Sequence, residues 1–258
     1  MPYLPGTGTI ARFALIEALR GRLAYAVIAV AVLGLAVSLF LGEMAITEAA
    51  RIQGSALAAF NRMAAALLVV SFVISGITRE QADKGIEMLL SQAIPRASYV
   101  VGKLIGYTAL AWLAAAVFSA PLMLFAPAEN VVVWGVSLAL ELTLVVGAAL
   151  ACALVIGQSA LSLLMVAAFY TLSRIMASIL AITANPVGPI DSLSFRVMGW
   201  VMGALAALLP GLDRFASASW LWEGSAAWSH LPALLIQFVI YLPLLAAVAL
   251  FDFYRKNL

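Results

Sequence analysis

Long apolar stretches constrain the fold of this chain more than any other feature of its sequence. The first, residues 23–41, runs for nineteen residues without a charge. As an α-helix rising 1.5 Å per residue, it is long enough to cross the hydrocarbon core of a bilayer, which is about 30 Å thick. Five further stretches of the same character follow, at about residues 56–77, 99–126, 131–156, 160–184 and 231–251. We therefore expect an all-α, polytopic membrane protein with six transmembrane helices.

The composition excludes a soluble globular fold. Of the 258 residues, 65% are hydrophobic and only 10% are charged, whereas about 25% of the residues in a soluble domain are charged. The single cysteine, Cys152, lies within an apolar stretch, so the sequence excludes an intrachain disulfide and a cysteine metal site. The net charge of +2 gives no reason to expect a nucleic-acid partner.

Basic residues are distributed unevenly between the two sides of the expected membrane. Nine lie on the side of the termini and of the loop between the second and third stretches, and three lie in the opposite loops. The nine are Arg12, Arg20, Arg22, Arg79, Lys84, Arg96, Lys103, Arg255 and Lys256, and the three are Arg51, Arg196 and Arg214. Because cytoplasmic loops carry the excess of basic residues, we expect a protein of the cytoplasmic (inner) membrane with both termini cytoplasmic.

A long polar stretch, residues 78–106, separates the second and third apolar stretches. Its charges at positions 80, 83, 84 and 87 are three or four residues apart, and so lie on one face of a helix. Apolar residues at 86 and 88–90 supply the other side, which predicts a short amphipathic helix over residues 80–90. Pro95 ends this helix, and Ser98 can cap the next one.

Part of this stretch, residues 85–106 (GIEMLLSQAIPRASYVVGKLIG), resembles the signature of the ABC-2 type permeases, the membrane halves of a class of ATP-driven exporters. The matching elements are a Glu before a Leu-Leu-Ser triplet, then a Pro with a basic residue, then a Gly-Lys-Leu triplet. In this sequence they are Glu87, Leu89, Leu90, Ser91, Pro95, Arg96, Gly102, Lys103 and Leu104.

The resemblance implies a single ABC-2 type transmembrane domain over residues 1–258. Residues 1–22 would be an N-terminal interfacial elbow and residues 79–98 a cytoplasmic coupling element that docks on a separate ABC ATPase subunit, which binds ATP and Mg. A second permease copy or homologue and membrane lipid would complete the assembly. The implied docking residues are Glu80, Asp83, Lys84, Glu87, Leu89 and Leu90, and Pro95, Arg96 and Lys103 would anchor the element to the membrane surface.

Residues 185–230 are expected to form an outer loop. Within it, the apolar piece 197–209 is too short to cross the membrane and ends at Pro210, which predicts a re-entrant or interfacial helix. Three tryptophans of this region, Trp220, Trp222 and Trp228, suit a membrane-interface belt.

Two charges are expected deep in the membrane. Residues 157–159 form a tight turn, so the fourth and fifth stretches are predicted to form an antiparallel hairpin. Glu141 and Arg174 each lie about ten residues from the outer end of their stretch, and so about 15 Å deep. A lone charge at this depth costs about 3 kcal/mol, which favours an ion pair between them. Contact with a polar or anionic substrate is the alternative role.

Smaller signals complete the pattern. Arg62 is expected near the start of the second span, where it can reach the membrane interface, and Pro121 is expected to kink the third. Gly102-x-x-x-Gly106 and Gly199-x-x-x-Gly203 match a small-residue packing motif.

The function predicted from the sequence is that of an exporter permease with an unidentified, hydrophobic or lipidic substrate. The chain is expected to hold no metal or cofactor and not to be an enzyme itself, because no phosphate loop, zinc-ligand set or nucleophile elbow is present in the sequence. Two alternatives stay open: a permease that serves the maturation of an extracytoplasmic metalloenzyme or haem protein, and a membrane scaffold subunit without a translocation pathway.

Overall fold

The structure is a computed structural model and describes residues 6–44, 48–83, 95–184, 193–223 and 228–255. Within these ranges the chain is helical and contains no β-strand. Six of the helices are long and apolar enough to cross a membrane. This confirms the predicted all-α, polytopic class.

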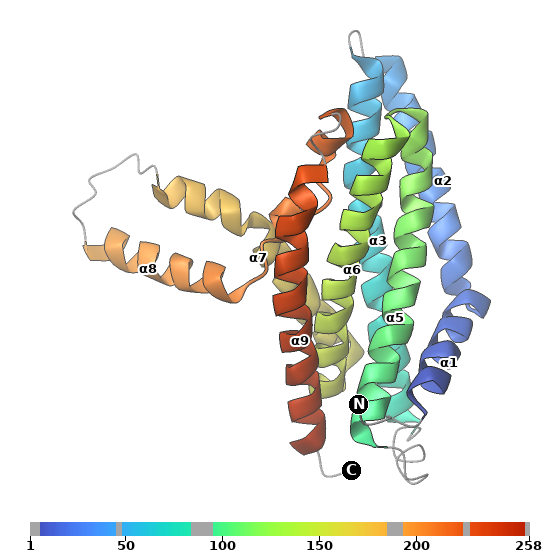
Figure 1. Cartoon of the computed structure of the whole chain (residues 1–258), viewed down its shortest axis with the longest axis vertical. Helices are drawn as coiled ribbons and strands as arrows, with labels where there is room; N and C mark the ends of the chain where they lie inside the picture. Colours follow the sequence, from blue (N-terminus) through green and yellow to red (C-terminus); the bar gives the residue numbers. More distant parts are fainter. Residues whose placement is uncertain (1–5, 45–47, 84–94, 185–192, 224–227, 256–258) are drawn as a thin grey trace.

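Figure 1 shows how the helices are arranged in chain order. The α-helices are α1 (Thr7–Arg20), α2 (Arg22–Met44), α3 (Ala49–Ala82), α5 (Arg96–Ser119), α6 (Ala128–Ile156), α7 (Ser159–Ala184), α8 (Leu193–Leu208) and α9 (Leu231–Arg255), and the 3₁₀ helices are η1 (Ala120–Leu124), η2 (Leu212–Arg214) and η3 (Ala218–Trp222). Apart from the unforeseen early start of α3, the six spans lie close to the predicted stretches.

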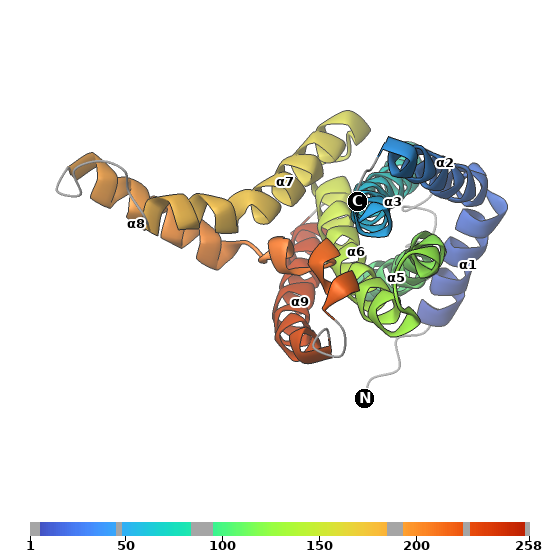
Figure 2. The same ribbon diagram turned by 90° about the horizontal axis from the view of Figure 1, so that it is seen from above.

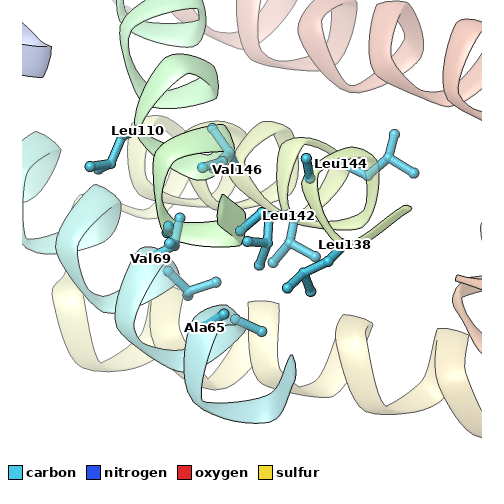
Figure 3. Close-up of a cluster of buried hydrophobic side chains, with 14 of the residues drawn as sticks. Ala65, Val69, Leu110, Leu138, Leu142, Leu144 and Val146 are labelled. Carbon is cyan, nitrogen blue, oxygen red and sulfur yellow. The ribbon is translucent and has the colours of Figure 1, made fainter. Parts of the chain in front are cut away.

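Helix α6 is the axis of the bundle, with α3, α5, α7 and α9 around it (Figure 2). In the most apolar 18-residue segment of α6, 83% of the residues are buried against the rest of the chain. Leu138 and Leu142 of α6 pack in a cluster with Val69 of α3 and Leu110 of α5 (Figure 3). A helix that is apolar on all sides is expected to be enclosed by others, and α6 follows this rule.

One end of the bundle, here named the connector end, gathers the end of α3, the starts of α1 and α5 and the end of α9 (Figure 1). The opposite end is named the far end. The predicted amphipathic helix over residues 80–90 is only partly described. Residues 80–82 continue α3 without a break, because residues 77–82 contain neither Pro nor Gly. Residues 84–94 lie outside the described residues.

Helix α1 packs along α5 through the first glycine motif. A Cβ atom added to Gly106 would lie 2.6 Å from the carbonyl oxygen of Ala11, and one added to Gly102 would lie 2.9 Å from Cβ of Ile10. The two glycines thus permit a close approach that larger residues would prevent. The predicted elbow is therefore a helix bound to α5, and the chain turns into α2 at Gly21.

Two predicted turns take different forms. Gly157, with φ +70°, ends α6 in the left-handed conformation and leads directly into α7, which confirms the hairpin. Pro121 was expected to kink a continuous span. Instead α5 ends at Ser119 and the chain tightens into η1, with Pro121 in its first turn.

The later part of α7 and α8 lie side by side and project from the bundle (Figures 1 and 2). After α8 the chain bends by 63° into the segment Leu212–Trp222, which returns to the bundle. The hydroxyl of Tyr241 on α9 holds this bend by donating to the carbonyls of Ala207 and Leu209, at 3.2 and 3.0 Å. A bend of this size fits a re-entrant loop or one broken span, and the re-entrant or interfacial helix over residues 197–209 stays a prediction.

Candidate functional site

The first candidate site is a polar cluster at the connector end. The carboxylate of Glu80, in the last turn of α3, forms an ion pair with the ammonium group of Lys103 on α5. It also accepts a hydrogen bond of 2.7 Å from the hydroxyl of Tyr99. The cluster joins the two helices that flank residues 84–94.

The ion pair between Glu80 and Lys103 is mostly buried, so it contributes to the packing of α3 against α5. The side chain of Lys103 is only 3% exposed and that of Glu80 23%. The ammonium group also lies 6.0 and 5.6 Å from the ring centroids of Tyr99 and Tyr107, within the range of a cation–π contact. The expected role of Lys103 as an anchor to the membrane surface does not fit this environment, because its charge is enclosed by protein.

Arg96 joins α5 to α9 at the same end. Its Nη1 donates to the carbonyls of Phe253 and Tyr254, each at 3.2 Å, in the last turn of α9. Helix C-termini carry unpaired carbonyls and partial negative charge, so a guanidinium is favourable there. Tyr99 stacks on Phe253, with ring centroids 5.7 Å apart. The first turn of α5 is thereby fixed to α9 as well as to α3.

The remaining residues of the predicted docking surface are placed only in part. Asp83 follows α3 and pairs with Arg79 at 3.7 Å, with both side chains mostly exposed. Pro95 precedes α5 with ψ 137°, outside the helical region. The other predicted contacts, Lys84, Glu87, Leu89 and Leu90, lie outside the described residues.

The second candidate site is a charged cluster halfway along α6. Arg174 of α7 donates to the Oε1 atom of Glu141 at 3.0 Å, which confirms the predicted ion pair. The hydroxyl of Tyr170, one turn earlier on α7, donates to the same oxygen at 2.9 Å. The Glu141 side chain is 1% exposed and that of Arg174 16%.

The same cluster holds the returning segment after α8. Arg174 Nη1 donates to the carbonyl of Leu212 at 2.7 Å, and its Nη2 lies 3.4 Å from that of Phe215. Arg62 of α3 donates to the carbonyl of Ala216 at 3.1 Å. Arg62 therefore does not reach the membrane interface as expected. Its guanidinium is held by this carbonyl inside the bundle, and helix α3 begins seven residues earlier than predicted, at Ala49.

Polar residues of α6 complete the contact with this segment. Trp134 donates to the carbonyl of Ala216 at 3.0 Å, and Ser137 accepts from the Ala216 N–H at 2.9 Å. Nearer the far end, Asn130 donates to the carbonyl of Leu221 at 3.1 Å. Ala216 itself has φ +44°, the left-handed conformation that a non-glycine residue rarely adopts.

It was not predicted from the sequence that side chains of α6 and α7 bind the segment that returns after α8. A signal for it is present: Asn130, Trp134, Ser137 and Glu141 are four, three and four residues apart on an otherwise apolar helix. That spacing puts hydrogen-bonding groups on one face, and buried polar groups require partners. The predicted tryptophan belt is also altered, because Trp220 is buried and stacks on His230 at 4.9 Å between ring centroids.

A search of the sequence against protein-family models and against curated proteins gives no match to either.

Proposed function

We propose that this chain is the membrane subunit of an ABC-2 type exporter that moves a hydrophobic or lipidic substrate across the cytoplasmic membrane. A separate ABC ATPase subunit would bind ATP and Mg and supply the energy, and a second permease copy or homologue would complete the pathway. The proposal rests on the motif of residues 85–106 and on one structural observation, the buried ion pair between Glu80 and Lys103.

This ion pair would allow a force on the motif to reach several helices. It holds the end of α3 against α5, so residues 84–94 connect two helices that are already joined. Arg96 extends the connection to α9, and the glycines at 102 and 106 extend it to α1. A partner that pushes on residues 84–94 would therefore displace four helices together, which is what the transmission of ATP-driven movement requires.

The experiment that tests this proposal is purification of the tagged full-length chain from its native membrane in mild detergent, followed by mass spectrometry. We expect a P-loop ATPase to co-purify and to be lost when Lys84→Glu and Glu87→Lys are combined. Glu48→Lys with Arg51→Glu, an exposed pair at the far end, is the matched control and should retain the ATPase. Absence of an ATPase under several mild conditions would refute the proposal.

A membrane scaffold subunit is the second candidate, favoured by the enclosed apolar surroundings of α6. A scaffold needs no mechanical coupling between residues 84–94 and the spans. In the purified complex, Lys103→Met would then leave ATP hydrolysis unchanged, whereas the exporter predicts a change in its rate.

A further inference from the structure

A lateral groove with a cavity volume of about 70 Å³ lies between α3 and α7, with α6 as its floor. Its walls are residues 63–70 of α3 and 163–171 of α7, and Val145 contributes the floor. Almost all of the lining is apolar, and the hydroxyls of Tyr170 and Thr171 come from the end of the α7 wall. A groove this narrow and apolar suits a single hydrocarbon chain that lies along it, rather than a bulky polar ligand.

Both walls continue into arginines at the same end of the groove. Arg62 is one turn before Ala66 on α3, and Arg174 is one turn after Tyr170 on α7. Residues three or four positions apart share a helix face, so each guanidinium extends its wall by one turn. Arg62 lies within electrostatic range of Arg174, Glu141 and Tyr170, which places the charged cluster at the head of the groove.

The charges of this cluster do not balance. Among the described residues, two guanidinium groups face one carboxylate, which leaves one positive charge in excess. The Nε atom of Arg62 is buried and has no hydrogen-bond partner within the described part of the chain, and the same holds for the Oε2 atom of Glu141. A phosphate group would accept from the Arg62 Nε and balance the charge, and a headgroup hydroxyl would donate to the free carboxylate oxygen.

The charged cluster lies about halfway along α6, far from both ends of the bundle. Glu141 lies thirteen residues from the first residue of α6 and fifteen from the last, or about 20 Å from either end. A bilayer offers a headgroup no polar surroundings at this depth. A headgroup that binds there is therefore one in passage between the two leaflets.

We propose that the groove between α3 and α7 binds an anionic phospholipid, with an acyl chain between the helices and its phosphate at Arg62. This inference rests on the proposed function, because it names the substrate class of the exporter. Arg174 acts mainly as a positioning residue, since it holds Glu141 and the Leu212 carbonyl.

The chain contains its own control for this inference. A second groove, with a cavity volume of about 220 Å³, lies between α1, α2 and α5 and is lined by apolar residues alone, among them Val27, Leu110 and Ala114. Without a charged end, it should accept acyl chains whatever their headgroup. Selectivity for an anionic headgroup should therefore be found in the first groove and not in the second.

The test uses the full chain in vesicles that contain phosphatidylglycerol or phosphatidylcholine, each with the same diazirine group on the acyl chain. After photolysis, peptide mass spectrometry locates the labelled residues. Phosphatidylcholine carries the same phosphate, but its choline cancels the negative charge and has no hydroxyl to donate to Glu141. We therefore expect phosphatidylglycerol to label residues 63–70 and 163–171 severalfold more than phosphatidylcholine does, and the second groove to be labelled equally by both. Arg62→Gln should remove the preference and leave the second groove unchanged, and Arg62→Lys should keep part of it.

Ala66→Phe provides a variant that leaves both arginines in place and fills the groove. It should reduce labelling of the first groove by both lipids, and a circular dichroism spectrum like that of the unaltered chain shows that it is folded. Equal labelling by the two lipids in the unaltered chain, or a preference that survives Arg62→Gln, would overturn the inference. Photolabelling requires no ATPase, so its outcome is separate from that of the co-purification experiment.

Discussion

The guanidinium of Arg174 lies 3.0 Å from the carboxylate of Glu141 and donates from the same nitrogen to the carbonyl of Leu212 at 2.7 Å. One side chain thus joins α7 to α6 and to the segment that returns after α8. An ion pair predicted to close a helical hairpin therefore also fixes a third part of the chain.

This arrangement predicts an asymmetric response to substitution. Arg174→Gln removes the ion-pair partner of a buried carboxylate, which keeps only the hydroxyl of Tyr170, and the donor to two carbonyls. We therefore expect a loss of about 3 kcal/mol or more. Glu141→Gln should cost less, because Arg174 keeps its carbonyl partners. The double variant should be more stable than Arg174→Gln alone, since no unpaired carboxylate remains. Thermal unfolding in detergent measures all three, and strictly additive losses would show that the pair is not coupled.

The Glu80–Lys103 pair should be important for stability, in contrast to the exposed pair close to it. Lys103→Met leaves a half-buried carboxylate with Tyr99 as its remaining partner and should lower the melting temperature by several degrees. Adding Glu80→Gln should restore part of the loss. Asp83→Asn, which breaks the exposed pair with Arg79, should cost less than about 0.5 kcal/mol. Equal effects of Lys103→Met and Asp83→Asn would contradict this reading of burial.

The two glycine motifs should respond in opposite directions to alanine. At Gly106 the new Cβ would meet the backbone of Ala11 at 2.6 Å, so Gly106→Ala should separate α1 from α5 and cost about 1–3 kcal/mol. At Gly203 no other part of the described chain lies within 4 Å of the added Cβ, so Gly203→Ala should be neutral or stabilise by up to about 1 kcal/mol through helix propensity. Melting temperatures of the two variants in the same detergent compare them directly.

Ala216 offers a test of the returning segment. Its φ of +44° is unfavourable for any residue with a Cβ, and the side chain is fully buried. We expect Ala216→Gly to be tolerated or mildly stabilising, because it relieves this conformation. Ala216→Val should cost about 2 kcal/mol or more, because a β-branched side chain cannot adopt the conformation and does not fit the space. Similar stability of the two variants would count against the conformation described.

The orientation predicted from the basic residues can be measured with cysteine labelling in intact cells. Asp83 and Glu48 are exposed at the connector end and the far end, and each can be replaced by Cys in a Cys152→Ser background. A membrane-impermeant maleimide should label Glu48→Cys, and should label Asp83→Cys only after the cells are opened. The reverse pattern would invert the proposed orientation.

The parts of the fold that were predictable depend on local sequence. Apolar length located the six spans, and the turn at Gly157 located the hairpin and so the pairing of Glu141 with Arg174. These inferences need only the rise of a helix and the cost of a buried charge. The start of α3 was missed because residues 49–55 contain Arg51, Gln53 and Ser55 and so lie outside the apolar stretch. Hydropathy marks the limits of an apolar stretch, whereas the helix continues beyond them.

The parts that were not predictable depend on contacts between distant residues. Lys103 was expected at the membrane surface because its sequence neighbours are those of a helix end, and nothing local indicates that Glu80 lies opposite it. Arg62 and Ala216 are 154 residues apart, and the hydrogen bond that joins them follows from the path of the chain after α8. Hydropathy and spacing describe single helices, and these contacts are properties of their packing.

The buried position of α6 has a consequence for biosynthesis. Glu141 is synthesised before its partner exists, because Arg174 is made 33 residues later and the carbonyls that bind Trp134 and Asn130 later still. A ribosome that has completed α6 alone presents to the insertion machinery a helix with an unpaired charge and several unfilled hydrogen-bonding groups. Helices α6 and α7 are therefore expected to enter the lipid as one unit. The full set of hydrogen bonds between α6 and the segment after α8 can form only after residue 221 has been synthesised.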